Sequence, residues 1–223
     1  MKVLKIPNFV LWIGLILFIC LTIFLFIFNI ISINQYEDDL NTLNLSLEEN
    51  NTKLLEKTEK LNSSESFLNS YLNGRGYYLS AIQSHNNVDY KYDEAIKRYD
   101  KGDWNSALAW FEDSVKWCTI TGDKYKETND IFNITIKYTS NETYQNIVDT
   151  YLKMINTSSN AIVFLYEASE FYVSVCEYYL DGNYDEARDT RDKADEKFTF
   201  YENEMLIFED YRQDLQNILI ELS

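Results

Sequence analysis

Glycine and proline are scarce in this sequence, whose 223 residues include six glycines and one proline. Folds rich in β-strands need frequent turns, and glycine and proline supply many of them. The single proline, Pro7, stands near the N-terminus and interrupts no later segment. The sequence therefore predicts an all-α fold.

Histidine is nearly absent, and the residue patterns of common catalytic sites are missing. The one histidine, His85, lies in a polar run and is not part of a Glu-x-x-His pair, so we expect it to be a solvent-exposed helix residue. The sequence contains no Gly-x-Ser-x-Gly, no P-loop and no Gly-x-Gly-x-x-Gly. We expect neither enzymatic activity nor a bound metal or cofactor.

Positive charge is in deficit, because 20 Lys and Arg stand against 36 Asp and Glu, giving a formal net charge of -16. Nucleic acids are bound by clustered Lys and Arg, so the sequence does not favour a nucleic-acid partner. Along residues 185–197 the carboxylates alternate with Arg and Lys, which is typical of a solvated, salt-bridged helix face.

Charged residues are also missing from residues 9–28, a run of 20 residues that is long enough to span a bilayer core. The sequence that follows, NIISINQYEDD, has no small-residue cleavage site. We therefore expect an uncleaved transmembrane helix over residues 9–33, preceded by an N-terminus of residues 1–8.

The charges on the two sides of this segment predict its orientation. Lys2 and Lys5 precede it, whereas Glu37, Asp38 and Asp39 follow it. Basic flanks stay in the cytoplasm. The sequence thus predicts a single-pass protein of the cell membrane with a cytoplasmic N-terminus and a C-terminal domain outside.

Residues 34–73 have the pattern of a helical stalk with coiled-coil character. Their leucines recur at every seventh position, a spacing that favours a helix partner. The companion positions, three further along, are only partly apolar. One interpretation is a parallel homodimer, and the other is packing against the protein's own later helices. The stripe consists of Leu40, Leu47, Leu54, Leu61 and Leu68, and its companions are Leu43, Asn50, Lys57, Ser64 and Tyr71.

Gly74 and Gly76 are expected to end the stalk helix, and an acidic helical domain follows over residues 77–223. Its helices are predicted at residues 77–101, 104–136, 142–181 and 184–221. Tight turns are expected at Lys101–Trp104 and Asp181–Tyr184, where glycine and short polar residues interrupt long aromatic-rich runs. A Ser or Asn cap is expected near Ser140.

Two of the predicted hairpins share a turn motif. The first reads Gly102, Asp103, Trp104, Ala107, Phe111 and Ser114, and the second reads Gly182, Asn183, Tyr184, Ala187 and Ala194. This motif resembles the helical hairpin of tetratricopeptide repeats, which implies close helix packing beneath each turn. The separation of the two glycines is more than twice the repeat of that family, which is about 34 residues. A bundle of about four helices with tetratricopeptide-like turns is the alternative to a repeat stack.

Aromatic residues are plentiful and provide candidates for a binding surface. Tyr and Trp often anchor such surfaces, although they also fill cores. The candidates are Tyr92, Tyr99, Trp104, Trp110 and Trp117. Cys118 and Cys176 are the cysteines outside the membrane segment, and they form either a disulfide or two buried, unlinked thiols.

These features favour a membrane-anchored extracytoplasmic module that binds another protein. A structural spacer or assembly factor of the cell envelope is the first alternative. The second alternative is a sensor ectodomain, which would need a membrane partner because only about eight residues are expected in the cytoplasm. The expected partners are the lipid bilayer, another protein and, through the stalk, a second copy of the chain.

Overall fold

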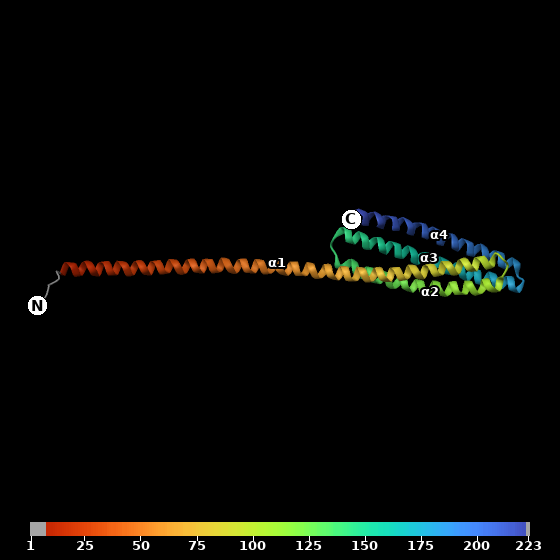
Figure 1. The fold of residues 1–223 in the computed structure, drawn as a ribbon, viewed down its shortest axis with the longest axis horizontal. Coiled ribbons are helices and arrows are strands. Elements are labelled where there is room, and N and C mark those ends of the chain that lie inside the picture. Colours follow the sequence, from red (N-terminus) through yellow and green to blue (C-terminus); the bar gives the residue numbers. More distant parts are fainter. Residues whose placement is uncertain (1–7, 222–223) are drawn as a thin grey trace. The chain divides into compact units, whose positions relative to one another are not determined.

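The computed structural model describes residues 8–221, with side chains from residue 17 onward except those of residues 33 and 36. Four α-helices, α1 (Asn8–Tyr99), α2 (Trp104–Thr135), α3 (Glu142–Asp181) and α4 (Tyr184–Glu221), follow one another, with a short 3₁₀ helix, η1 (Ile136–Tyr138), after α2 (Figure 1). The described residues include no strand. The predicted all-α fold is therefore confirmed.

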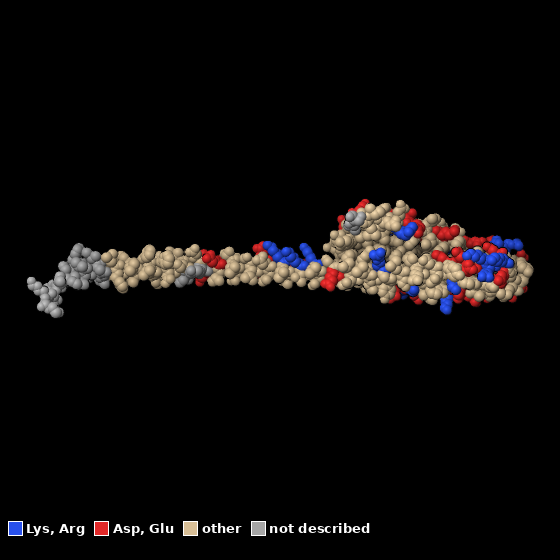
Figure 2. Space-filling model, viewed as in Figure 1, with Lys and Arg blue, Asp and Glu red and all other residues tan. Residues whose placement is uncertain are grey.

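The chain divides into two compact units, one ending at Lys60 and the other running from Leu61 to Ser223. The first unit consists of the N-terminal part of α1. This part of the helix is long and apolar enough to cross a membrane, and its apolar window is not buried within the protein. The apolar window is the tan stretch free of red and blue atoms in Figure 2, and charged residues follow it along the helix.

The second unit is a helical bundle built from the C-terminal part of α1 with α2, α3 and α4. The buried positions of α2 are separated by steps of three and four, the spacing that keeps one helix face on a core. They are Ala107, Phe111, Ser114, Cys118, Thr121, Tyr125, Thr128, Phe132 and Thr135. Helix α3 buries many more of its residues than α4 does, because α3 packs against both α2 and α4.

Stacked rings fix the register of the antiparallel helices α2 and α3. Trp104 stacks on Tyr179 at 4.3 Å, and Phe111 stacks on Tyr172 at 4.8 Å between centroids. A step of one heptad forward on α2 thus corresponds to one heptad backward on α3. The same register places Phe132 on Tyr151, 4.9 Å apart, at the other end of the pair.

Helices α1 and α3 run parallel, and their ring contacts repeat along the core. The ring centroids of Tyr71 and Tyr151 are 6.0 Å apart and those of Tyr92 and Tyr172 are 6.1 Å apart, two pairs with the same difference in residue number. One heptad further along α1, Tyr78 and Tyr99 contact the same two partners at 5.3 Å. The turn glycines Gly102 and Gly182 differ in residue number by as much as Tyr71 and Tyr151 do. The spacing of the two turns in the sequence therefore equals the offset between these contacting residues of α1 and α3. Because Tyr92 also stacks on Phe198 of α4 at 4.9 Å, all four helices contribute to one core.

The two predicted hairpin turns are confirmed. Gly102 and Gly182 have φ of 73° and 78°, a left-handed conformation that favours glycine. Asp103 N donates to Arg98 O, and Asn183 N donates to Tyr178 O, the bond that closes a Schellman turn.

Side-chain caps begin two of the helices. Asp103 accepts a hydrogen bond from Ser106 N at the start of α2. The cap expected near Ser140 is Asn141, which accepts from Tyr144 N at the start of α3. Each cap satisfies one of the backbone donors that an α-helix leaves free at its N-terminus.

The expected helix break at Gly74 and Gly76 is wrong, since α1 continues through both glycines. A glycine inside a helix costs about 1 kcal/mol relative to alanine, which tertiary packing easily outweighs. A Cβ on Gly74 would lie 3.2 Å from Ile131 Cγ2 and 3.2 Å from Phe132 Cζ, so this glycine permits close approach of α1 and α2. A Cβ on Gly76 would meet no atom within 4 Å beyond its chain neighbours and the backbone of its own helix.

Candidate functional site

The leucine stripe remains exposed along α1. The exposed fractions are 58% for Leu40, 53% for Leu47, 63% for Leu54, 68% for Leu61 and 53% for Leu68. None of these leucines is therefore buried by the rest of the described chain. The stripe is a regular apolar feature of the helix surface.

Leu68 shows why the stripe escapes the bundle. Its neighbour Phe67 is 9% exposed and stacks on Tyr144 at 5.2 Å, so Phe67 occupies the core position. Successive residues of an α-helix point about 100° apart. The leucine stripe therefore lies on a face of α1 next to the face that packs in the core, although both faces repeat every seven residues.

The five aromatic candidates all take part in contacts within the bundle. Tyr92 is 3% exposed and belongs to the core. Tyr99 and Trp104 contact each other, 5.0 Å apart, at the turn between α1 and α2. Trp110 lies under Lys91, whose Nζ is 4.3 Å from the ring centroid, and Trp117 is partly buried against the core. These contacts give all five side chains a packing role in the bundle.

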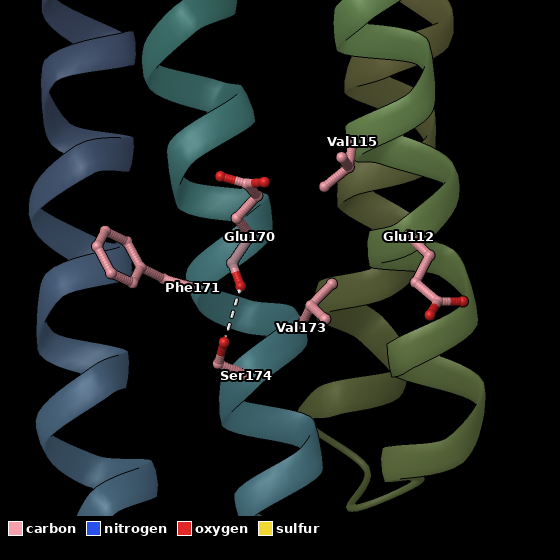
Figure 3. A pocket seen from close by; sticks show the side chains of 6 residues that line it. All are labelled: Glu112, Val115, Glu170, Phe171, Val173 and Ser174. Atoms are coloured by element: carbon pink, nitrogen blue, oxygen red, sulfur yellow. Dashed lines mark hydrogen bonds between the residues drawn. The ribbon is translucent and has the colours of Figure 1, made fainter.

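A shallow groove of about 630 Å³ lies between α2 and α3 (Figure 3). Its apolar part includes Val115 and Val173, which point toward each other across the gap, and Glu112 and Glu170 provide acidic groups. The Tyr166 hydroxyl donates to Glu170 Oε1 at 2.6 Å. This groove was not predicted from the sequence, where its signal is a pair of valines at partly exposed helical positions.

Ion pairs occupy the predicted salt-bridged region of α4. Lys197 Nζ lies 2.6 Å from Glu167 Oε2 on α3, and Arg191 Nε lies 3.8 Å from Asp195 Oδ2. Positive and negative side chains are interleaved on the visible face of the bundle (Figure 2). This confirms the expectation of a mixed, salt-bridged face.

Hydrogen-bonded hydroxyl pairs lie inside the bundle. Ser114 on α2 bonds Ser169 on α3 at 2.9 Å, and Thr121 donates to Ser84 on α1 at 2.9 Å. Buried polar groups are tolerated when each finds a partner. Ser114 and Thr121 occupy buried positions of α2 that follow the three-and-four spacing. In the sequence alone, these polar residues look like interruptions of an apolar helix face.

The expectation for His85 is wrong, because its side chain is 3% exposed. Its Nδ1 lies 2.9 Å from the Tyr125 hydroxyl of α2, and its Nε2 lies 3.4 Å from the Tyr201 hydroxyl of α4. His85 stands one heptad after Tyr78 and one heptad before Tyr92, both of them core residues. This spacing was the available signal, and the polar neighbours of His85 concealed it.

A carboxylate completes the group around the imidazole. Tyr201 donates to Asp89 Oδ1 at 2.5 Å, and the same oxygen lies 3.8 Å from His85 Nε2. Burial lowers the pKa of His85 from its usual 6.5, and Asp89 partly offsets this effect. Burial likewise raises the pKa of Asp89, which His85 and the Tyr201 hydrogen bond partly counteract. His85, Asp89, Tyr125 and Tyr201 are called the His85 cluster below.

Cys118 and Cys176 are free thiols, 1% and 0% exposed. In the register of α2 and α3, Cys118 lies opposite Leu165, which is about 16 Å from Cys176 along the helix at 1.5 Å per residue. A disulfide requires Cα atoms within about 7 Å. The bundle therefore separates the two thiols. Burial raises the pKa of each to about 12.

The described residues include no group of three or more His, Cys, Asp and Glu side chains that could hold a metal ion. No protein-family model, no curated protein and no solved structure matches the chain.

Proposed function

We propose that this protein is a single-pass, membrane-anchored interaction module whose bundle lies outside the cytoplasm and whose stalk associates with a second copy. The observation that carries the proposal is the exposed leucine stripe, in which all five members are more than half exposed. A regular apolar surface of this kind marks a site of protein–protein contact. One leucine in every heptad suits another helix with the same repeat.

The membrane anchor favours a copy of the same chain as the partner of the stripe. Chains anchored in one bilayer share their orientation, and confinement raises their effective concentration. Asn50, in the companion row of the stripe, can pair with its equivalent and set a parallel register. Lys57 in the same row places like charges together, so we expect a weak association that depends on the membrane.

Paired leucine substitutions test this proposal in the full chain reconstituted into lipid nanodiscs or vesicles. Leu47→Asn with Leu54→Asn should abolish chemical cross-linking of the dimer. Leu45→Asn with Leu55→Asn is the matched control, since these leucines are 67% and 65% exposed on the same helix but lie outside the stripe. Equal cross-linking of both variants and the wild type would refute association through the stripe.

The proposed orientation is tested separately. Because Lys2 and Lys5 flank only the N-terminal side of the span, protease added to intact cells without a wall should digest residues after 36. Protection of the bundle until the cells are lysed contradicts this orientation. A mature protein shortened by about 30 residues would instead identify a cleaved signal peptide.

The groove between α2 and α3 favours a second binding partner of the module. Val115 and Val173 offer apolar contact while Glu112 and Glu170 add negative charge, which together suit an apolar segment flanked by Lys or Arg. A synthetic amphipathic helix of leucine and lysine should bind the full chain less tightly after Glu112→Gln with Glu170→Gln. A control that removes the same charge from α4, at residues 185 and 186, should bind as the wild type does. Equal affinities of all three proteins would refute binding in the groove.

A further inference from the structure

The His85 cluster joins three helices through one chain of hydrogen bonds. Asp89 and His85 are on α1, Tyr125 is on α2 and Tyr201 is on α4. Tyr201 is 9% exposed and Tyr125 is fully buried, whereas the Asp89 side chain is 38% exposed. The carboxylate therefore connects the buried imidazole with solvent.

The geometry selects one tautomer of the neutral imidazole. Tyr201 uses its proton to bond Asp89, so its oxygen can only accept from His85 Nε2. With the proton on Nε2, Nδ1 accepts from the Tyr125 hydroxyl at 2.9 Å. Every donor then has an acceptor. The other tautomer would leave Nε2 facing an oxygen without a proton between them.

We propose that the His85 cluster is an acid-sensitive latch, in which proton uptake by His85 releases Tyr201 and thereby loosens α4 from α1. This inference is independent of the anchoring and association proposed above. In the imidazolium form both ring nitrogens are donors. Nε2–H⁺ then competes with Tyr201 for Asp89, which lies 3.8 Å from that nitrogen.

The neighbours of the cluster support this exchange of partners. On α3, the buried Ser158 hydroxyl interacts with Tyr125, so it can accept the Tyr125 proton once Nδ1 is protonated. The remaining titratable groups that interact with the cluster are Tyr78 and Asp93 on α1 and Cys118 on α2. None of these three described groups is a cation, so none of them opposes protonation of the imidazole by charge repulsion.

The other hairpin shows that packing does not require a histidine here. Tyr92 and Tyr172 occupy matching positions in the two hairpins, and the same difference in residue number matches His85 with Leu165, which is fully buried. The equivalent position in the same bundle is therefore filled by a leucine. A buried ionisable group where the matching position of the other hairpin has an apolar residue points to a role beyond core formation.

The direction of the pH effect follows from linkage. Since the pKa of His85 is lower in the folded state than its usual 6.5, its contribution to stability is present above about pH 6.5 and is lost as the pH falls. The raised pKa of Asp89 acts in the opposite direction at lower pH, because the folded state binds that proton more readily. The latch thus opens progressively below about pH 6.5 until His85 is protonated in the folded state, and protonation of Asp89 acts against this opening.

The chain has one histidine, so a single imidazole can be titrated by NMR in the full protein in nanodiscs while hydrogen exchange reports on α4. We expect His85 to titrate below pH 6.5. The equilibrium constant for opening of α4 around Tyr201 is obtained from hydrogen exchange after correction for the intrinsic exchange rate. It should increase about tenfold for each pH unit below about pH 6.5, until His85 is protonated in the folded state. Titration of His85 without faster exchange in α4 would overturn the latch.

Two substitutions of His85 separate the latch from general acid sensitivity. His85→Leu copies the other hairpin, and His85→Gln keeps polarity without the charge; either one should remove the pH dependence of α4 exchange between about pH 7 and 5. Tyr201→Phe should increase α4 exchange already in neutral solution, whereas Tyr166→Phe on α3 should not. A pH response that persists in a folded His85 variant would contradict the proposal.

Discussion

The leucine stripe and the bundle section of α1 share a period of seven, yet they differ in what covers them. The stripe has one leucine per heptad, and each of its members is more than half exposed. The bundle section adds a second buried position to each heptad and alternates large and small residues, as in Tyr78, Ala81, Val88, Tyr92 and Ala95. Burial within the chain thus requires two core positions per heptad with complementary sizes.

The largest expected difference in the free energy of unfolding is between a substitution in the bundle and one in the leucine stripe. Phe111→Ala removes a fully buried ring stacked on Tyr172, and it should lower the free energy of unfolding by about 3–5 kcal/mol. Leu54→Ala, at a leucine that is 63% exposed, should change it by less than about 0.5 kcal/mol. Denaturant unfolding of the full chain in detergent, followed by tryptophan fluorescence, measures both. Similar losses would mean that the bundle depends on the stripe.

The two glycines near the beginning of the bundle sharpen the comparison. Gly74→Ala places a methyl group 3.2 Å from Phe132, so we expect a loss of about 1–3 kcal/mol. Gly76→Ala meets open space and should stabilise α1 by up to about 1 kcal/mol. The same unfolding experiment distinguishes them, and a stabilising Gly74→Ala would show that α1 and α2 are less closely packed.

A smaller effect is expected at the beginning of α3. Asn141→Ala removes the side chain that accepts from Tyr144 N, and it should cost about 1 kcal/mol. Asn87→Ala, at an exposed position inside α1, is the control and should be neutral or slightly stabilising. The difference between the two midpoints of thermal unfolding measures the cap. Equal midpoints would show that α3 does not need it.

The smallest effect is expected from reductant, which should leave the unfolding midpoint unchanged because Cys118 and Cys176 are free. Buried thiols with a pKa near 12 should resist alkylation in mildly alkaline solution in the folded protein and react after denaturation. Mass measurement counts the labels. A pair that reacts only after both denaturation and reduction would establish a disulfide and contradict the register of α2 and α3.

Local residue chemistry was sufficient to predict much of the fold. The lack of proline and glycine predicted helices, and Gly102 and Gly182 marked both hairpin turns, because a left-handed residue is a local requirement. The apolar run near the N-terminus similarly identified the one described helix that is able to span a membrane. The candidate site was less predictable, since the aromatic residues that suggested a binding surface are used for packing.

The order of the amino acids alone defined the helices, their turns and the separation of the two hairpins, since these depend on local conformational preference and periodicity. Three further features were settled by packing: α1 continues through Gly74, Cys118 and Cys176 are far apart, and His85 is buried among hydrogen-bonding partners. Each of these features depends on which face of one helix meets which residues of another. That choice follows from register between segments distant in sequence, where local patterns carry little information.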